Sequence, residues 1–117
     1  MIETFRVENK SGAYIEVCNY GASLVSVVVP DKCGKLGNVI LSYKNVDDYL
    51  NDSFYLGSTV GRVANRITNA RFVLDGVVYD LDKNDGSNSN HGGFNGFNQQ
   101  FFETKRADDQ IICSYLS

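Results

Sequence analysis

Two short segments carry side chains that can hydrogen-bond a polyhydroxylated small molecule. Residues 57–67 (GSTVGRVANRI) place Asn65 next to Arg66, and residues 90–97 (NHGGFNGF) contain His91, the one histidine of the chain. Asparagine offers both donors and acceptors, and arginine offers a planar fork of donors. Sugar hydroxyls suit such a pair, because each presents a donor and an acceptor on the same oxygen.

Local chemistry leaves an alternative open for each segment. The imidazole of His91 can donate, accept or shuttle a proton near neutral pH, and Gly92 and Gly93 let a ligand approach closely. A solvated loop histidine fits the same residues at least as well. In the other segment, composition alone favours Arg62 and Arg66 pairing with acidic neighbours or capping exposed carbonyls.

Other kinds of site find little support in the sequence. Gly57 and Gly61 are not followed by Gly-Lys-Ser/Thr, and no Gly-x-Gly-x-x-Gly occurs, so nucleotide binding is not indicated. Cys18, Cys33 and Cys113 form no Cys-x-x-Cys pair, which favours reduced thiols over a disulfide framework. Scattered cysteines and one histidine also argue against zinc. We expect no metal ion and no cofactor.

Length and composition limit the partners and the compartment. With 117 residues, 43% hydrophobic and 21% charged, the chain is at most one globular domain. A net charge of −3 argues against nucleic-acid binding, and no segment has the apolar length that spans a bilayer. Residues 1–6 show no apolar signal core, so the expected compartment is the cytoplasm.

The elements that must position these side chains are predicted to be strands. Period-two alternation and β-branched runs favour short strands at residues 14–20, 24–29, 39–41, 101–105 and 111–116. The run 24–29 is typical of a strand covered on both faces, and 39–41 of a short buried one. Asn45 as N-cap, with Asp48 three residues on, predicts one helical turn over residues 46–50. The fold class is therefore all-β.

A hairpin and a long loop flank the two polar segments. Residues 71–81 alternate around Asp75-Gly76, a dipeptide that favours a two-residue type I′ turn. Residues 82–96 are mostly Asn, Asp, Ser, Gly and His, and they predict a long loop of functional importance or little order. The apolar strand at the end of the chain has no successor, so its unpaired edge predicts self-association.

The chain resembles the N-terminal part of the aldose 1-epimerase (galactose mutarotase) family. The most specific matches are Gly-Arg-Val-Ala-Asn-Arg-Ile at residues 61–67 and His-Gly-Gly at 91–93, in that order and spacing. Further matches lie at residues 19–22, 29–31, 34–35, 39–41, 48–50 and 72–76. The resemblance implies that residues 1–117 are a single incomplete domain, the opening portion of a large antiparallel β-sandwich.

The same resemblance implies roles for the polar residues. Asn65 and Arg66 match the family's sugar-contacting pair, and His91 matches the first of two active-site histidines, near the ring side of the sugar. The family's second histidine and its glutamate base lie downstream of this chain. Asn90, where an apolar residue is usual, and Phe101-Phe102, in place of a Trp-containing stretch, depart from the pattern in ways that bear on packing.

Two hypotheses follow for function. The chain is a member of a family that interconverts the α and β anomers of aldohexoses such as galactose or glucose, with His91 as its one catalytic residue and no activity alone. Alternatively, it is a non-catalytic β-domain that binds carbohydrate weakly or mainly self-assembles. In both, the expected small-molecule partner is a monosaccharide.

Overall fold

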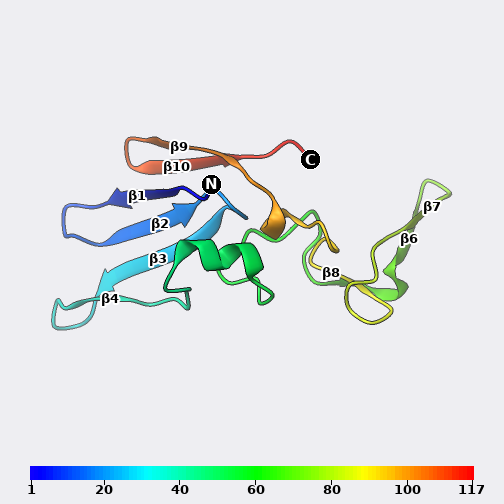
Figure 1. Cartoon of the computed structure of the whole chain (residues 1–117), viewed down its shortest axis with the longest axis horizontal. Coiled ribbons are helices and arrows are strands. Elements are labelled where there is room, and N and C mark those ends of the chain that lie inside the picture. The colour runs from blue at the N-terminus through cyan, green and yellow to red at the C-terminus, as the bar shows by residue number, and fades with distance from the viewer.

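The computed structural model describes all 117 residues, and it confirms a mostly antiparallel all-β chain (Figure 1). The strands are β1 (Thr4–Glu8), β2 (Tyr14–Cys18), β3 (Ser23–Pro30), β4 (Leu36–Asn38), β5 (Arg66–Ile67), β6 (Arg71–Leu74), β7 (Val77–Asp80), β8 (Ser89–Asn90), β9 (Glu103–Ala107) and β10 (Gln110–Ser114). Three short 3-10 helices interrupt them: η1 (Val46–Asn51), η2 (Thr68–Ala70) and η3 (Phe97–Gln99). No helix is long and apolar enough to cross a membrane.

A four-stranded antiparallel sheet forms one half of the molecule, in the order β1-β2-β3-β4. The predicted strand at residues 24–29 is confirmed as β3, which ends at Pro30 because proline cannot continue the ladder. The prediction that both faces of this strand are covered is wrong, since Leu24 and Val29 are exposed. Neither side chain packs in the buried core around Ile2, Cys18 and Tyr49, so both stay in contact with water.

The predicted buried strand at residues 39–41 is also wrong. The strand lies earlier, at β4, and Val39 and Leu41 are 63% and 81% exposed. The Asp31 carboxylate accepts hydrogen bonds from the amides of the turn that follows β3, which sets Leu36 opposite Pro30 and starts the pairing early. The ladder then ends at Asn38, whose side chain accepts the amide hydrogen of Val27 at 3.0 Å.

The helical turn expected at residues 46–50 is confirmed as η1, while η2 and η3 were not predicted. Asn45 occupies the N-cap position, but its side chain makes no capping hydrogen bond. Tyr49 on η1 packs with Ile2 and Cys18 to form the small buried core. Tyr43 lies edge-on to Tyr49 at 5.0 Å, and its hydroxyl donates to Asp52 at 2.7 Å, which raises the pKa of Tyr43 to about 12.

The hairpin predicted around Asp75-Gly76 is confirmed as β6–β7. Both turn residues have positive φ, 50° and 77°, as a type I′ turn requires. Phe72 stacks on Tyr79 across the strands, with ring centroids 5.0 Å apart. The hairpin projects from one end of the molecule and makes no ladder with any other strand (Figure 1).

The strands expected at residues 101–105 and 111–116 are confirmed with shifted bounds, as β9 and β10. They form a hairpin that lies beside β1 (Figure 1). Phe101 instead forms an isolated bridge with Tyr20, and their rings meet edge-on at 5.0 Å. No strand other than β9 pairs with β10, so self-association through that edge stays a prediction.

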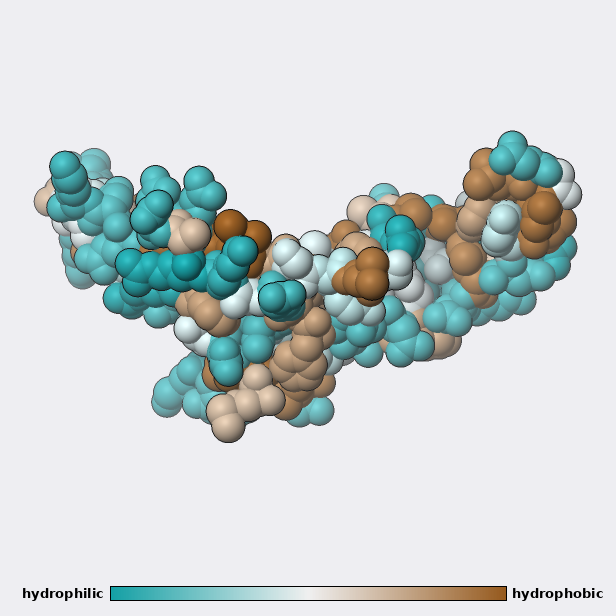
Figure 2. Space-filling view, turned by 90° about the horizontal axis from the view of Figure 1, so that it is seen from above, coloured by the Kyte–Doolittle hydropathy of each residue, from teal (hydrophilic) through white to brown (hydrophobic).

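The molecule is elongated and buries little of itself. It measures 55 × 27 × 26 Å, and its radius of gyration is 17.0 Å. A compact domain of this length would have a radius of gyration of about 13 Å. Only 13 of the 117 residues are buried, and apolar side chains gather on the surface of the β6–β7 end (Figure 2). This chain alone therefore leaves much apolar surface in contact with water.

Candidate functional site

The two polar segments singled out in the sequence lie side by side. The antiparallel pair β5–β8 joins them, with Arg66 opposite Asn90 and Ile67 opposite Ser89. Just beyond this pair, the amide of His91 donates to the carbonyl of Asn65 at 3.1 Å. The structure therefore brings Asn65, Arg66 and His91 together, although His91 lies 25 positions after Arg66 in the sequence.

A backbone hydrogen bond sets the state of the imidazole. Nδ1 of His91 accepts the amide hydrogen of Asn65 at 2.9 Å. An imidazole nitrogen that accepts carries no proton, so the neutral ring is protonated at Nε2. Tyr55 lies edge-on to this half-buried ring, with centroids 4.8 Å apart and planes at 61°. His91 therefore presents an Nε2–H donor rather than a freely turning ring.

Arg66 is held by a carboxylate from the loop. Its Nε donates to Oδ2 of Asp85 at 2.5 Å, and Nη1 makes a long contact of 3.5 Å with Oδ1 of Asn65. Oδ1 of Asn65 also accepts the amide hydrogen of Arg66 at 2.9 Å. Because only the Nε–H is used in the ion pair, most of the Nη hydrogens remain able to donate to a ligand. Both side chains of the ion pair are largely exposed.

The structural alternatives for the two arginines are therefore present in this structure. Arg66 pairs with an acidic neighbour, and Arg62 donates to the carbonyl of Ser117 at 2.8 Å. For Arg62, the hydrogen bond to Ser117 gives the guanidinium a partner within the chain, and no hydrogen bond links it to His91. For Arg66 the ion pair fixes the direction of the guanidinium beside Asn65 without using all of its donors.

Short polar side chains hold the long loop over residues 82–96. The side chain of Asn84 makes two hydrogen bonds with the backbone of Asn90. Its Nδ2 donates to the Asn90 carbonyl at 2.8 Å, and its Oδ1 accepts the Asn90 amide hydrogen at 2.7 Å. Oδ1 of Asn88 accepts the amide hydrogen of Asn69 at 3.1 Å, and Asp82 accepts that of Phe94 at 3.0 Å. The loop is thus tied to β5 and η2 by hydrogen bonds rather than by apolar packing.

Glycine is required where the histidine loop meets the arginine segment. Gly92 has a φ of +90°, and a Cβ built there would lie 1.9 Å from the carbonyl oxygen of Gly61. The amide of Phe97 donates to the same carbonyl at 3.1 Å. The close approach of Gly92 to Gly61 therefore explains why a glycine follows His91.

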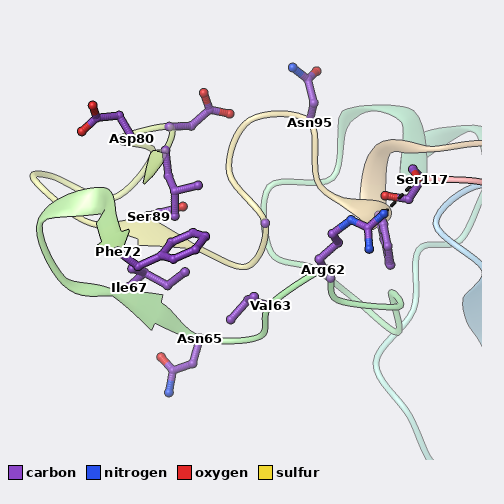
Figure 3. Close-up of a pocket in the computed structure, with 14 residues that line it drawn as sticks. Arg62, Val63, Asn65, Ile67, Phe72, Asp80, Ser89, Asn95 and Ser117 are labelled. Carbon is purple, nitrogen blue, oxygen red and sulfur yellow. Dashed lines mark hydrogen bonds between the residues drawn. The ribbon is translucent and has the colours of Figure 1, made fainter. Parts of the chain in front are cut away.

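A cleft of about 460 Å³ lies next to these residues but does not coincide with them (Figure 3). Asn65 lines it, whereas Arg66 and His91 do not. Its apolar lining comes from Val63, Ile67, Phe72, Leu81 and Phe97. In Figure 3 the side chain of Asn65 points away from Ile67 and Phe72. We assign the candidate site to the polar contacts around His91, because two of the three sugar-contacting residues expected from the sequence, Arg66 and His91, lie outside this cleft.

Sequence reasoning missed Tyr55, Asp85 and Asn84 as neighbours of the site. Tyr55 lies just before residues 57–67, so its closeness to Asn65 in the chain was the one available signal. Asp85 and Asn84 are two of many polar residues in their loop, and nothing local singles them out. No group of three His, Cys, Asp or Glu side chains is arranged to hold a metal ion.

Comparison with known proteins covers nearly the whole chain. The family model for aldose 1-epimerase matches residues 3–117. The bovine galactose mutarotase is 36% identical over 116 residues, which cover 99% of this chain and 34% of the relative. The Escherichia coli aldose 1-epimerase is 30% identical over 111 residues, which cover 95% and 32%. The chain thus spans about a third of the length of these curated relatives.

Comparison with solved structures points to the same family. A GalM/aldose epimerase homologue from C. elegans matches with a TM-score of 0.92 and 33% identity, covering 98% of this chain and 36% of that protein. A galactose 1-epimerase from Lactobacillus acidophilus matches with a TM-score of 0.75 and 30% identity, covering 93% and 36%. The elongated arrangement of this chain is therefore the arrangement of the corresponding part of longer proteins.

Proposed function

This chain belongs to the aldose 1-epimerase family, and on that premise we propose that Asn65, Arg66 and His91 form the sugar-contacting part of a mutarotase site. The observation that carries the proposal is the pair of hydrogen bonds between Asn65 and His91. They place the two family motifs in contact and leave the Nε2–H of His91 free to donate. Most of the Nη hydrogens of Arg66 are free as well. The proposed ligand is an aldohexose such as galactose or glucose.

The arrangement suits hydroxyl and ring oxygens. The Nε2–H of His91 donates to one sugar oxygen, and the guanidinium of Arg66 donates to others. The side-chain nitrogen Nδ2 of Asn65 is a further donor next to His91 and Arg66. Asp85 supports binding by fixing the guanidinium, since a group already held in one orientation loses less entropy when the ligand arrives.

Interconversion of anomers needs two proton transfers. A base removes the proton of the anomeric hydroxyl while an acid protonates the ring oxygen, and the C1–ring oxygen bond breaks to give the open aldehyde. Rotation about C1–C2 and the reverse transfers close the ring on the other face. Among the residues of the site, His91 is the one group suited to proton transfer, because the Asp85 carboxylate is paired with Arg66.

We therefore propose that residues 1–117 bind the sugar but do not accelerate its mutarotation alone. In this proposal the base and the acid come from polypeptide outside these residues, and His91 is catalytic only in their presence. The test is the optical rotation of freshly dissolved α-D-galactose with and without the purified chain. Acceleration that disappears in His91→Ala would contradict the claim of inactivity.

A second candidate function is self-assembly, and the exposed apolar hairpin β6–β7 favours it. Six of its eight strand residues are exposed apolar side chains: Phe72, Val73, Leu74, Val77, Val78 and Tyr79. The unpaired edge of β10 offers a further contact. Sedimentation velocity over a range of concentrations tests the idea, and a monomer at the highest concentration rejects it. The cytoplasmic compartment stays a prediction.

A further inference from the structure

Tyr55 contacts the histidine of the proposed site from a part of the chain that belongs to neither β5 nor β8. Its ring meets the His91 ring edge-on, with centroids 4.8 Å apart. Edge-to-face geometry of this kind is a preferred arrangement of aromatic rings. The hydroxyl of Tyr55 makes no hydrogen bond within the chain, so the ring itself is what the fold brings to His91.

The turn that carries Tyr55 is built around one carboxylate. Oδ1 of Asp52 accepts the amide hydrogen of Phe54 at 3.0 Å and the hydroxyl hydrogen of Tyr43 at 2.7 Å, while Oδ2 accepts the amide hydrogen of Leu56 at 3.0 Å. The two bonds from backbone amides flank Tyr55, whose φ is 58°. Asp52 therefore orders the turn on both sides of the aromatic ring.

The turn is also fixed to the main sheet. The carbonyl of Gly57 accepts the amide hydrogen of Leu24 on β3 at 2.9 Å. A Cβ at Gly57 would lie 2.2 Å from the Leu24 carbonyl oxygen, so the two backbones meet at a distance that only glycine allows. Tyr55 thus extends from the sheet toward the histidine loop and links the two halves of the molecule.

One hydrogen bond does not fix an imidazole. Nδ1 of His91 accepts the amide hydrogen of Asn65, but a ring held at a single atom can still tilt, or turn over so that Nδ1 leaves its donor. The edge contact of Tyr55 opposes both movements, because it occupies the space beside the ring. Together the two contacts hold the Nε2–H in one direction.

We propose that Tyr55 is a positioning residue for His91. It keeps Nδ1 on the amide of Asn65, and thereby keeps the proton on Nε2 and that donor directed toward the ligand. The claim that the Nε2–H points toward a sugar rests on the proposed function. The claim that Tyr55 fixes the orientation of the His91 ring does not.

The single histidine makes the test sharp, because every imidazole signal in the nitrogen NMR spectrum comes from His91. In sugar-free wild type, we expect one ring nitrogen at a protonated position and one at an unprotonated position. In Tyr55→Leu the two signals should move toward each other, as the ring exchanges between its neutral forms. Tyr55→Phe keeps the ring contact and should restore the wild-type separation.

Phe54→Leu is the matched control, since Phe54 lies on the same turn, is 75% exposed and makes no aromatic contact with His91. A second variant, Asp52→Ala, removes no atom that touches the histidine but loosens the turn, and it should also narrow the separation. Amide signals of β1 and β2 report whether each variant keeps its fold. The proposal is overturned if folded Tyr55→Leu or folded Asp52→Ala keeps the wild-type separation of the two ring-nitrogen signals. It is also overturned if Phe54→Leu changes that separation as much as Tyr55→Leu does.

Adding D-galactose to the same samples separates this inference from the proposed function. If the ring signals respond to Tyr55→Leu but never to sugar, the positioning role stands and the sugar site fails. If sugar shifts the His91 signals in wild type while sugar-free Tyr55→Leu keeps the wild-type separation of the two ring-nitrogen signals, the sugar site stands and the positioning role is overturned.

Discussion

Replacing Gly92 by alanine should separate the histidine loop from the arginine segment. Gly92 has a φ of +90°, and its Cβ would lie 1.9 Å from the carbonyl oxygen of Gly61. Real Cβ atoms essentially never come within 3.0 Å of such an atom. The backbone must therefore open by more than an ångström at the point where the amide of Phe97 also donates to Gly61.

The magnitude follows from two contributions. A non-glycine residue forced into this backbone region costs about 1–3 kcal/mol. Loss or weakening of the Phe97–Gly61 hydrogen bond adds about 0.5–1.5 kcal/mol. We expect Gly92→Ala to lower the free energy of unfolding by about 1.5–4.5 kcal/mol, a large fraction of the stability of a small domain.

Gly86→Ala is the matched control. Gly86 lies in the same loop and also has positive φ, +60°, but a Cβ there meets nothing within 4 Å. Only the cost of a non-glycine residue at positive φ remains. This substitution should therefore lower the free energy of unfolding by about 1 kcal/mol. Urea unfolding of both variants measures the difference, and the ring-nitrogen signals of His91 show whether its bond to Asn65 survives. Equal losses in the two variants would refute the close-approach argument.

Three further predictions concern the histidine loop, the exposed β6–β7 hairpin and a tyrosine beside the core. Asn84→Ala removes both hydrogen bonds to the backbone of Asn90 and should cost about 1–3 kcal/mol in urea unfolding, with faster exchange of the Asn90 amide hydrogen. Arg71→Ala breaks an ion pair with Asp80 whose side chains are 59% and 69% exposed, so it should change stability by less than about 1 kcal/mol; a larger loss would contradict that estimate. Because the pKa of Tyr43 is raised from 10.0 to about 12, the unfolded chain loses that proton first, and thermal stability should fall as the pH rises between these values. Removing the carboxylate with Asp52→Ala should flatten this fall.

Elements with a complete local signal could be predicted from the sequence. Asp75-Gly76 demands positive φ at two successive residues, and the alternating residues on either side leave one register for β6 and β7. The β-branched run ended by Pro30 predicts β3 for the same kind of reason. Each of these signals lies within a few residues, so no distant partner was needed to read it.

Exposure and the supports of the site could not be predicted in this way. Val39 and Leu41 have the composition of a buried strand, but the ladder ends at Asn38 because of a side-chain contact with β3. Likewise, the pairing of Arg66 with Asp85 depends on how β5 meets β8. From the sequence alone, Asp82, the other acidic residue of the loop, is an equally good partner for Arg66. Such contacts are properties of the folded arrangement rather than of a local pattern.

The arrangement of Asn65 and His91 could be predicted from the sequence only in part. Their motifs predict two halves of a sugar site by family resemblance, but not the hydrogen bond from the Asn65 amide to Nδ1. That bond needs β5 and β8 to pair in one register, since a shift by one residue would turn each side chain to the opposite face. The structure therefore adds to the motifs which imidazole nitrogen is engaged within the chain, Nδ1, and which is left free to donate, Nε2.

The central claim is that Asn65, Arg66 and His91 contact an aldohexose. Its most direct test is the ring-nitrogen NMR signals of His91 during titration of the 117-residue chain with D-galactose. The account predicts a saturable shift of the Nε2 signal, weakened in Arg66→Ala and unchanged in Arg71→Ala, whose arginine lies in an exposed ion pair outside the site. No shift at any sugar concentration, or the same weakening in both variants, would contradict it.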